Sequence, residues 1–202
     1  MNYIAIDTSG KTLTVVLCKD DKIYSHHDTK CGLQHSTTLM PVIEKMANEI
    51  GFDFNSADFF ACVVGAGSFT GIRIGVSTIK AFCFAYNKPC LSITSFDTIA
   101  YNSKSGKVLA VIDAKHNGFY VCGYDNLKVS IEPSYIMKEE VLALKNDYEL
   151  LSFEEIKGLE TKVVSSLDGL ILAVQEKKGE TSFDLESLSP LYVRKSQAEE
   201  GR

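Results

Sequence analysis

Hydrophobic and polar positions at the start of the chain predict three consecutive β-strands. Apolar residues dominate residues 3–7 and 12–18, and a third strand-like run covers residues 22–28. Short turn signals separate the runs, at Ser9–Gly10 and at Asp20–Asp21. Such pairs of turn residues between strand-like runs are typical of consecutive strands joined by tight turns.

Residues 36–50 predict an amphipathic helix. Their apolar members recur at helical spacing: Leu39, Val42, Ile43, Met46 and Ile50. Ser36 stands where an N-cap is expected. Pro41 lacks a backbone N–H, so it fits this helix only within the first turn.

A second strand–helix unit follows. The continuous apolar run at residues 59–65 predicts a central strand that is buried on both faces. Residues 71–86 predict a helix that is apolar around most of its circumference, so it is covered either by this chain alone or partly by a partner. Residues 90–94 predict another strand, and Ser95 is expected to cap a short helix in residues 95–102.

The second half begins after a polar break at residues 102–107. Strands are predicted at residues 108–113 and 118–125, and helices at residues 138–144 and 167–177. This order of strands and helices predicts an α/β fold with mixed sheets.

The two halves share a pattern that suggests duplication. Residues 4–18 and residues 109–124 each form an apolar strand that ends in aspartate, then a turn, then a second apolar strand. The aspartates are Asp7 and Asp113. Because the pattern opens each half, we expect two related lobes, residues 1–102 and residues 103–202.

Composition excludes several classes of protein. The 202 residues are 45% hydrophobic and carry a net charge of −5, which argues against direct, tight binding of a nucleic-acid backbone. No apolar run approaches the roughly 20 residues that span a bilayer, and the start of the chain lacks a signal-peptide pattern. We therefore expect a cytoplasmic protein without membrane contact, whose six cysteines are buried free thiols.

The glycine-rich stretch Val63–Ser77, "VVGAGSFTGIRIGVS", is the strongest candidate for chemistry. Its spacing matches neither G-x-G-x-x-G, nor the Walker loop, nor the G-x-S-x-G elbow. Two interpretations remain open. Backbone N–H groups could hold an anion or nucleotide with the help of Asp7, Ser68, Thr70 and Arg73. Alternatively, three glycines permit a tight turn and close packing of the following helix: Gly67, Gly71 and Gly75.

The histidines predict no metal site. The chain contains neither H-x-x-x-H nor H-E-x-x-H, and the adjacent His26 and His27 would face opposite sides of a strand. No serine, cysteine or histidine lies in a motif that supports nucleophilic catalysis.

Three segments together resemble the TsaB family, also called YeaZ. They are "IAIDTS" at residues 4–9, "GAGSFTGIRIG" at residues 65–75 and "LYVRKSQAEE" at residues 191–200. The family's loop reads G-P-G-S-F-T-G-[IL]-R-[IV]-G, so Ala66 replaces its proline. The family's tail motif is matched by Tyr192, Arg194, Ala198 and Glu199.

The resemblance implies a duplicated actin/Hsp70-like α/β fold, with two lobes that each have a mixed sheet and flanking helices and with a shortened second lobe. It also implies a non-catalytic paralogue of the threonylcarbamoyltransferase TsaD. That relative carries H-x-x-x-H on its first-lobe helix, whereas here Leu39 stands four residues after His35. The implied role is a scaffold required for threonylcarbamoyladenosine at position 37 of tRNA.

Partners follow from the same resemblance. The family packs first-lobe helices against TsaD, with the ATPase TsaE joining the complex, and it also forms homodimers. Contact with tRNA is then indirect, no cofactor belongs to the chain itself, and ATP or ADP can lie at the complex interface. The expected interface residues come from the apolar stripes: Leu39, Val42, Ile43, Met46, Ile72, Val76 and Ile79.

Two enzymatic alternatives remain. A small kinase or ATPase of the same superfold would use Asp7 and the glycine loop for ATP, but the sequence lacks a Gly-Gly adenosine motif. A peptidase is suggested by relatives once classed as glycoproteases, but the sequence offers no metal or nucleophile motif for it.

Overall fold

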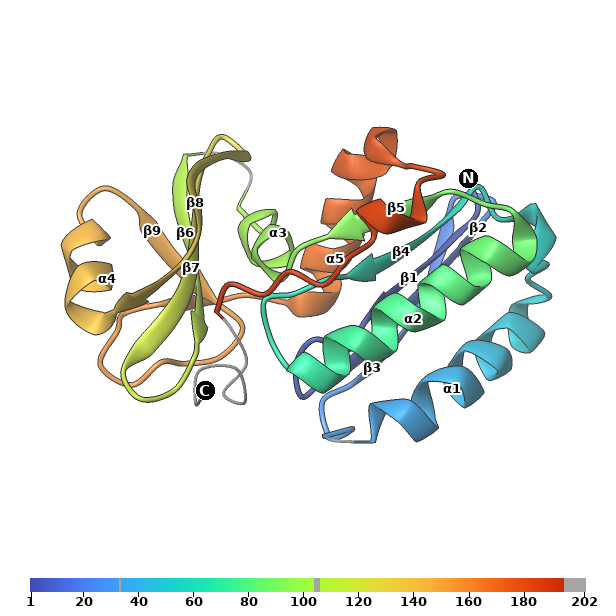
Figure 1. Cartoon of the computed structure of the whole chain (residues 1–202), viewed down its shortest axis with the longest axis horizontal. Coiled ribbons are helices and arrows are strands. Elements are labelled where there is room, and N and C mark those ends of the chain that lie inside the picture. The colour runs from blue at the N-terminus through green and yellow to red at the C-terminus, as the bar shows by residue number, and fades with distance from the viewer. Residues whose placement is uncertain (33, 104–105, 195–202) are drawn as a thin grey trace. The chain divides into compact units, whose positions relative to one another are not determined.

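Two five-stranded sheets form the protein (Figure 1). The structure is a computed structural model, and it describes residues 1–32, 34–103 and 106–194. The chain folds into two compact units, and each unit contains one sheet. No helix in the described part of the chain is long and apolar enough to cross a membrane.

The first sheet is mixed, as the sequence predicts. Its strands are β1 (Tyr3–Asp7), β2 (Leu13–Lys19), β3 (Lys22–Asp28), β4 (Phe59–Val63) and β5 (Cys90–Ile93). They lie in the order β3-β2-β1-β4-β5. β1 to β3 pair antiparallel, whereas β1, β4 and β5 run parallel. The β2–β3 turn has positive φ at Asp20 (52°) and Asp21 (61°), the backbone that suits a two-residue hairpin.

Helices α1 (His35–Ile50) and α2 (Phe69–Tyr86) lie side by side along this sheet (Figure 1). α1 begins one residue earlier than Ser36, and Gln34 occupies the N-cap, so the prediction of Ser36 as the cap is wrong. Pro41 is consequently the seventh residue of α1 and lies in its second turn rather than the first. The helix tolerates it because the carbonyl that loses a partner belongs to Thr37, which is exposed to solvent.

The C-terminal end of α1 is held by a specific polar contact. The Lys19 ammonium donates to the carbonyls of Ile50 (2.8 Å) and Gly51 (2.9 Å), where α1 ends. A cation at a helix C-terminus satisfies free carbonyls and opposes the negative end of the helix dipole. The short helix η1 (Phe54–Ser56) then leads into β4.

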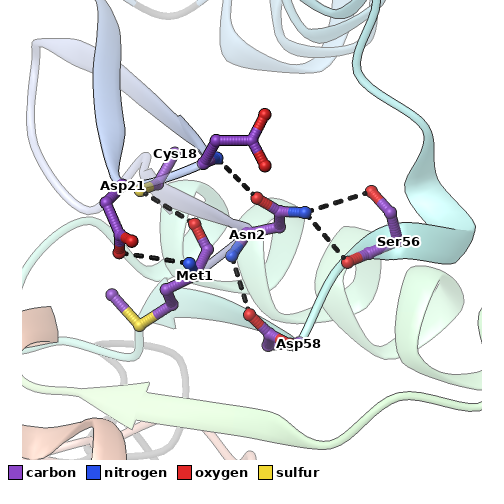
Figure 2. A network of polar contacts seen from close by, with 7 residues as sticks. Met1, Asn2, Cys18, Asp21, Ser56 and Asp58 are labelled. Atoms are coloured by element: carbon purple, nitrogen blue, oxygen red, sulfur yellow. Dashed lines mark hydrogen bonds and ion pairs between the residues drawn. The ribbon is translucent and has the colours of Figure 1, made fainter.

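A polar network fixes the start of β1 (Figure 2). The Met1 amino group lies 3.1 Å from the Asp21 carboxylate, and the Asn2 N–H donates to Asp58 over 2.7 Å. The Asn2 side chain donates to Ser56, and the Cys18 thiol donates to the Met1 carbonyl over 3.3 Å. These contacts join β1 to the β2–β3 turn and to the segment before β4.

The second sheet repeats the topology of the first. Its strands are β6 (Lys107–Asp113), β7 (Gly118–Asp125), β8 (Lys128–Met137), β9 (Glu149–Ser152) and β10 (Lys162–Val163), in the order β10-β9-β6-β7-β8. The other helical elements are α3 (Ser95–Ala100), α4 (Lys138–Leu144), α5 (Ser166–Lys177), η2 (Lys178–Glu180) and η3 (Leu185–Ser187). Ser95 is the first residue of α3 rather than its cap, and this helix ends two residues before residue 102.

The duplication inferred from the sequence extends to hydrogen bonds. In each sheet the first strand pairs antiparallel with the second and parallel with the fourth. Asp7 Oδ1 accepts the N–H of Ser9 over 2.8 Å, and Asp113 Oδ1 accepts the N–H of Lys115 over the same distance. The two aspartates therefore accept the same hydrogen bond, from the N–H two residues later, at the end of equivalent strands, although the β6–β7 turn has positive φ at Lys115, His116 and Asn117 and the β1–β2 turn does not.

One connection differs between the sheets, and it is shorter in the second sheet. α1 and α4 occupy equivalent positions, between the third and fourth strands of each sheet. α2 joins β4 to β5, whereas the equivalent β9–β10 connection is a loop at residues 153–161. Ile156 and Leu159 of this loop are buried in the core of the second sheet, where they cover apolar surface in place of a helix.

The compact units do not coincide with the predicted lobes, residues 1–102 and residues 103–202. The first unit comprises Met1–Thr94 and Val174–Pro190, and the second comprises Ser95–Ala173 and, of the segment that follows Pro190, the described residues 191–194. Residues 174–190 return to the first unit because Cys90 and Ser182 form a bridge with two backbone hydrogen bonds, of 2.8 Å and 2.9 Å. A division of the chain into two lobes at a single position could not assign this later segment to the first unit.

Candidate functional site

The glycine loop and the β1–β2 turn meet at one end of the first sheet. Ser68 is the N-cap of α2, and its Oγ accepts the N–H of Gly71 over 3.2 Å. The Ser68 N–H donates to the Ser9 carbonyl over 2.6 Å. Because Ser68 is the cap, α2 begins at Phe69, two residues before the prediction, and Arg73 lies in the second turn instead of the first.

The loop glycines allow this approach because they lack a Cβ. A Cβ on Gly67 would lie 2.3 Å from the Ser9 carbonyl oxygen, and one on Gly71 would lie 2.0 Å from the Thr8 carbonyl oxygen. A Cβ on Gly75 would lie 2.7 Å from the Thr8 hydroxyl. Gly67 also has a φ of +154°. All three glycines therefore serve close packing of this helix and loop on the chain's own β1–β2 turn.

Asp7 is buried, and its carboxylate is used inside this turn. Oδ1 accepts the Ser9 N–H over 2.8 Å and the Ser9 hydroxyl over 2.7 Å. Burial raises the pKa of Asp7, and the hydrogen bonds from Ser9 and the charges of His35 and His27 oppose that rise. This geometry agrees with a turn-capping aspartate.

The four candidate anion contacts fall into two groups. Asp7 and Ser68 are hydrogen-bonded to the β1–β2 turn and the start of α2. Thr70 and Arg73 are exposed on the first two turns of α2. The Arg73 guanidinium lies over the Phe69 ring, 3.8 Å from its centroid, in a cation–π contact. An anion or nucleotide contact of these residues stays a prediction.

Asp7→Asn is expected to reduce the pH dependence of folding stability. The native carboxyl has a pKa above its ordinary value of 3.8. The folded protein therefore holds this proton more tightly than the unfolded chain does. The stability that this tighter proton binding contributes is fully present below pH 3.8, and it is lost as the pH rises through the pKa of Asp7 in the folded protein. The amide keeps an oxygen acceptor for Ser9 without a buried charge, so urea unfolding should show a gain for Asp7→Asn that grows toward neutral pH.

Asp53 provides the matched control for this measurement. Its Oδ1 accepts the N–H of Asn55 over 2.9 Å in the same kind of turn, but the residue is exposed. For Asp53→Asn, the difference in the free energy of unfolding between neutral and acidic pH should equal that of the unsubstituted protein. A fall in stability at neutral pH for Asp7→Asn would contradict the assigned cost of burial.

His35 is anchored at the start of α1. Its Nε2 lies 2.8 Å from the Gly10 carbonyl oxygen, and its Nδ1 lies 3.4 Å from the Cys31 sulfur. Leu39, four residues later, is buried in the core. Within residues 1–32, 34–103 and 106–194, no group of three histidine, cysteine or acidic side chains is placed to hold a metal ion.

The interface residues predicted from the apolar stripes need correction. Val42 is partly exposed, but the other six are buried in the chain's own core: Leu39, Ile43, Met46, Ile72, Val76 and Ile79. The physical reason is that the strongest apolar stripe of a surface helix faces the sheet that it covers. A partner of these helices would therefore contact their other faces.

The outward faces of α1 and α2 carry apolar side chains, and of these the stripe analysis had named only Val42. Phe84 is 83% exposed and Met40 is 46% exposed. Small and apolar residues accompany them at exposed or partly exposed positions: Pro41, Val42, Ile74, Ala81 and Ala85. We call these exposed and partly exposed residues of the two helices, taken together, the outward face. Helical spacing could have found three of its members, since Ile74, Ala81 and Ala85 recur at intervals of seven and four residues.

The tail motif is only partly described. Ala198 and Glu199 lie outside the described residues. The Arg194 guanidinium lies 4.7 Å from the centroid of the Tyr135 ring, within the second unit. Tyr192 is exposed.

Comparison with known proteins gives consistent matches. Residues 27–163 match the family model described as "TsaD: tRNA N6-adenosine threonylcarbamoyltransferase". The chain is 32% identical over 124 residues to the TsaB protein of Bacillus subtilis, covering 59% of this chain and 53% of that protein. It is 27% identical over 150 residues to TsaB of Escherichia coli, covering 70% and 64%. The chain thus spans about half to two thirds of the length of these curated relatives.

A solved structure matches almost the whole chain. YeaZ from Pseudomonas aeruginosa superposes with a TM-score of 0.76 at 21% identity, covering 95% of this chain and 99% of that one. The predicted fold class is confirmed: a duplicated actin/Hsp70-like α/β fold with two mixed sheets and flanking helices.

Proposed function

This chain belongs to the TsaD family by its matched model and to the TsaB group by its curated relatives, and we propose that it is a non-catalytic subunit required for N6-threonylcarbamoyladenosine in tRNA. Those relatives carry the name of tRNA threonylcarbamoyladenosine biosynthesis proteins. Their shared name, across 124 and 150 aligned residues, is the observation that supports the pathway.

The proposed partner is the catalytic transferase of the TsaD type. We infer that it docks on the outward face of α1 and α2. Phe84 supports this inference, because a phenylalanine that is 83% exposed contributes nothing to the chain's own core. The small side chains of Ala81 and Ala85 beside it would let a second helix approach closely. Such an aromatic residue is a typical anchor in a protein–protein interface.

The remaining partners rest on family resemblance. We propose that a TsaE-type ATPase joins through the transferase, that the free chain forms a homodimer, and that tRNA contact is indirect. ATP or ADP would lie at the complex interface, with no cofactor held by this chain alone. The net charge of −5 supports an indirect role in tRNA binding. We also propose a cytoplasmic location, where tRNA modification would take place.

Depletion of the protein tests this function directly. Mass spectrometry of nucleosides from purified tRNA should show loss of N6-threonylcarbamoyladenosine after depletion, because the transferase would lack its required subunit. Re-expression of the unsubstituted chain should restore the nucleoside. Normal levels in depleted cells would overturn the proposal.

A further inference from the structure

Cys31 and His35 form a thiol–imidazole pair just before and at the start of α1. The Cys31 sulfur lies 3.4 Å from His35 Nδ1. On the other side of the ring, His35 Nε2 lies 2.8 Å from the Gly10 carbonyl oxygen. The three groups therefore form a series of two polar contacts, from the thiol to the imidazole and from the imidazole to the backbone carbonyl.

The carbonyl fixes the tautomer of the neutral ring. A carbonyl oxygen can only accept, so Nε2 must carry the hydrogen and donate it to Gly10. Nδ1 then has a free lone pair, and the Cys31 thiol donates to it. An imidazole in this orientation can take the thiol proton and leave a thiolate, which is the nucleophilic form of cysteine.

Three other cysteines make a different contact. The thiols of Cys18, Cys83 and Cys90 donate to the backbone carbonyls of Met1, Pro89 and Ser182. A carbonyl oxygen accepts a hydrogen bond but is not a base that can take the proton. Burial also raises the pKa of the thiols of Cys18, Cys62 and Cys83.

Access favours the same residue. Cys31 is 5% exposed, whereas each of the other five cysteines is 2% exposed or less. Cys31 also lies in the segment between β3 and α1, outside both elements. By the exposed fraction of the whole residue, Cys31 is therefore the most accessible of the six buried cysteines.

We propose that Cys31 is a modification site at which hydrogen peroxide oxidises the thiol to a sulfenic acid, with His35 as the proton acceptor. The Sγ proton passes to His35 Nδ1, and the thiolate attacks one oxygen of the peroxide. An S–O bond forms, and the O–O bond breaks. The leaving hydroxide takes the proton back from the imidazolium and becomes water. Sulfur loses two electrons, and the peroxide is reduced by the same two electrons.

The test uses the full chain, hydrogen peroxide and a sulfenic-acid trap such as dimedone, with peptide mass spectrometry at each of the six cysteines. Cys31 should be labelled first, about tenfold faster than Cys90 in the same sample. Equal or faster labelling of Cys90 overturns the proposal. This comparison needs no variant and does not depend on the proposed role in tRNA modification.

His35→Asn tests the role of the imidazole. The labelling rate of Cys31 divided by that of Cys90 should fall about tenfold, because the proton acceptor is gone. A general loosening of the fold would raise both rates and largely cancel in this ratio. His116→Asn is the matched control, because His116 is an exposed histidine of the second unit. It should leave the ratio unchanged, and an unchanged ratio in His35→Asn overturns the proposal.

Discussion

Gly71→Ala is expected to remove most of the folded protein. The added Cβ would lie 2.0 Å from the Thr8 carbonyl oxygen and 3.2 Å from its carbon. Both are backbone atoms of a buried turn, so no side chain can move aside. The Thr8 hydroxyl also donates to the Gly71 carbonyl over 2.7 Å, and a shift of α2 would break this bond.

The expected loss is therefore about 4 kcal/mol or more, against total stabilities of about 5–15 kcal/mol for ordinary domains. Urea unfolding of purified protein, or the soluble yield where none can be purified, measures it. Gly179→Ala is the control. A Cβ on Gly179 meets nothing within 4 Å, so this variant should stay within about 1 kcal/mol of the parent. A parental urea midpoint for Gly71→Ala would show that the turn is less tightly packed than the structure indicates.

The sequence predicts a strand or helix well where the element is buried, because its apolar pattern then has a single interpretation. β4 and β7 match their predicted residues closely because continuous apolar runs have few alternatives. β8 was not predicted, since it is an edge strand that has no fully buried residue and contains Pro133. β10 has two residues, too few for any periodicity. Its position depends on pairing with β9, which lies ten residues earlier in the chain.

The candidate site shows a different limit. The glycine spacing excluded known phosphate loops, and the structure shows what the glycines contact instead, the β1–β2 turn. That contact joins residues about 60 positions apart, and a single sequence contains no direct signal for it. The apolar stripes of α1 and α2 were identified correctly as apolar, but periodicity does not say whether a stripe faces a sheet or a partner. Burial decided that point.

The glycine loop belongs to a part of the fold in which the two halves differ. Asp7 and Asp113 accept the same hydrogen bond, from the N–H two residues later, so both halves retain the strand–turn–strand start. Only in the first half does a helix pack against that turn through glycines. In the second half, the loop at residues 153–161 takes the place of that helix. The paired helices that carry the outward face therefore belong to the first half alone.

Phe84→Lys is expected to abolish co-purification with the TsaD-type transferase. An anchoring aromatic side chain at an interface centre is worth about 2 kcal/mol or more, and a buried ammonium adds a desolvation cost. Binding should therefore weaken by at least about 30-fold. Lysine suits this position in the free chain, because residue 84 lies in the last turn of α2, where a cation opposes the helix dipole.

Phe183→Lys is the matched control for this prediction. Phe183 is also an exposed phenylalanine, at 69%, but it follows η2 and lies outside the outward face. The same chemical change there should leave partner binding unchanged, as measured by titration of purified proteins. In depleted cells, Phe183→Lys should restore N6-threonylcarbamoyladenosine and Phe84→Lys should not. Equal binding by both variants would place the partner on another surface and leave Phe84 without a role in docking, whereas a loss confined to Phe84→Lys would assign docking to the helix pair that the second half lacks.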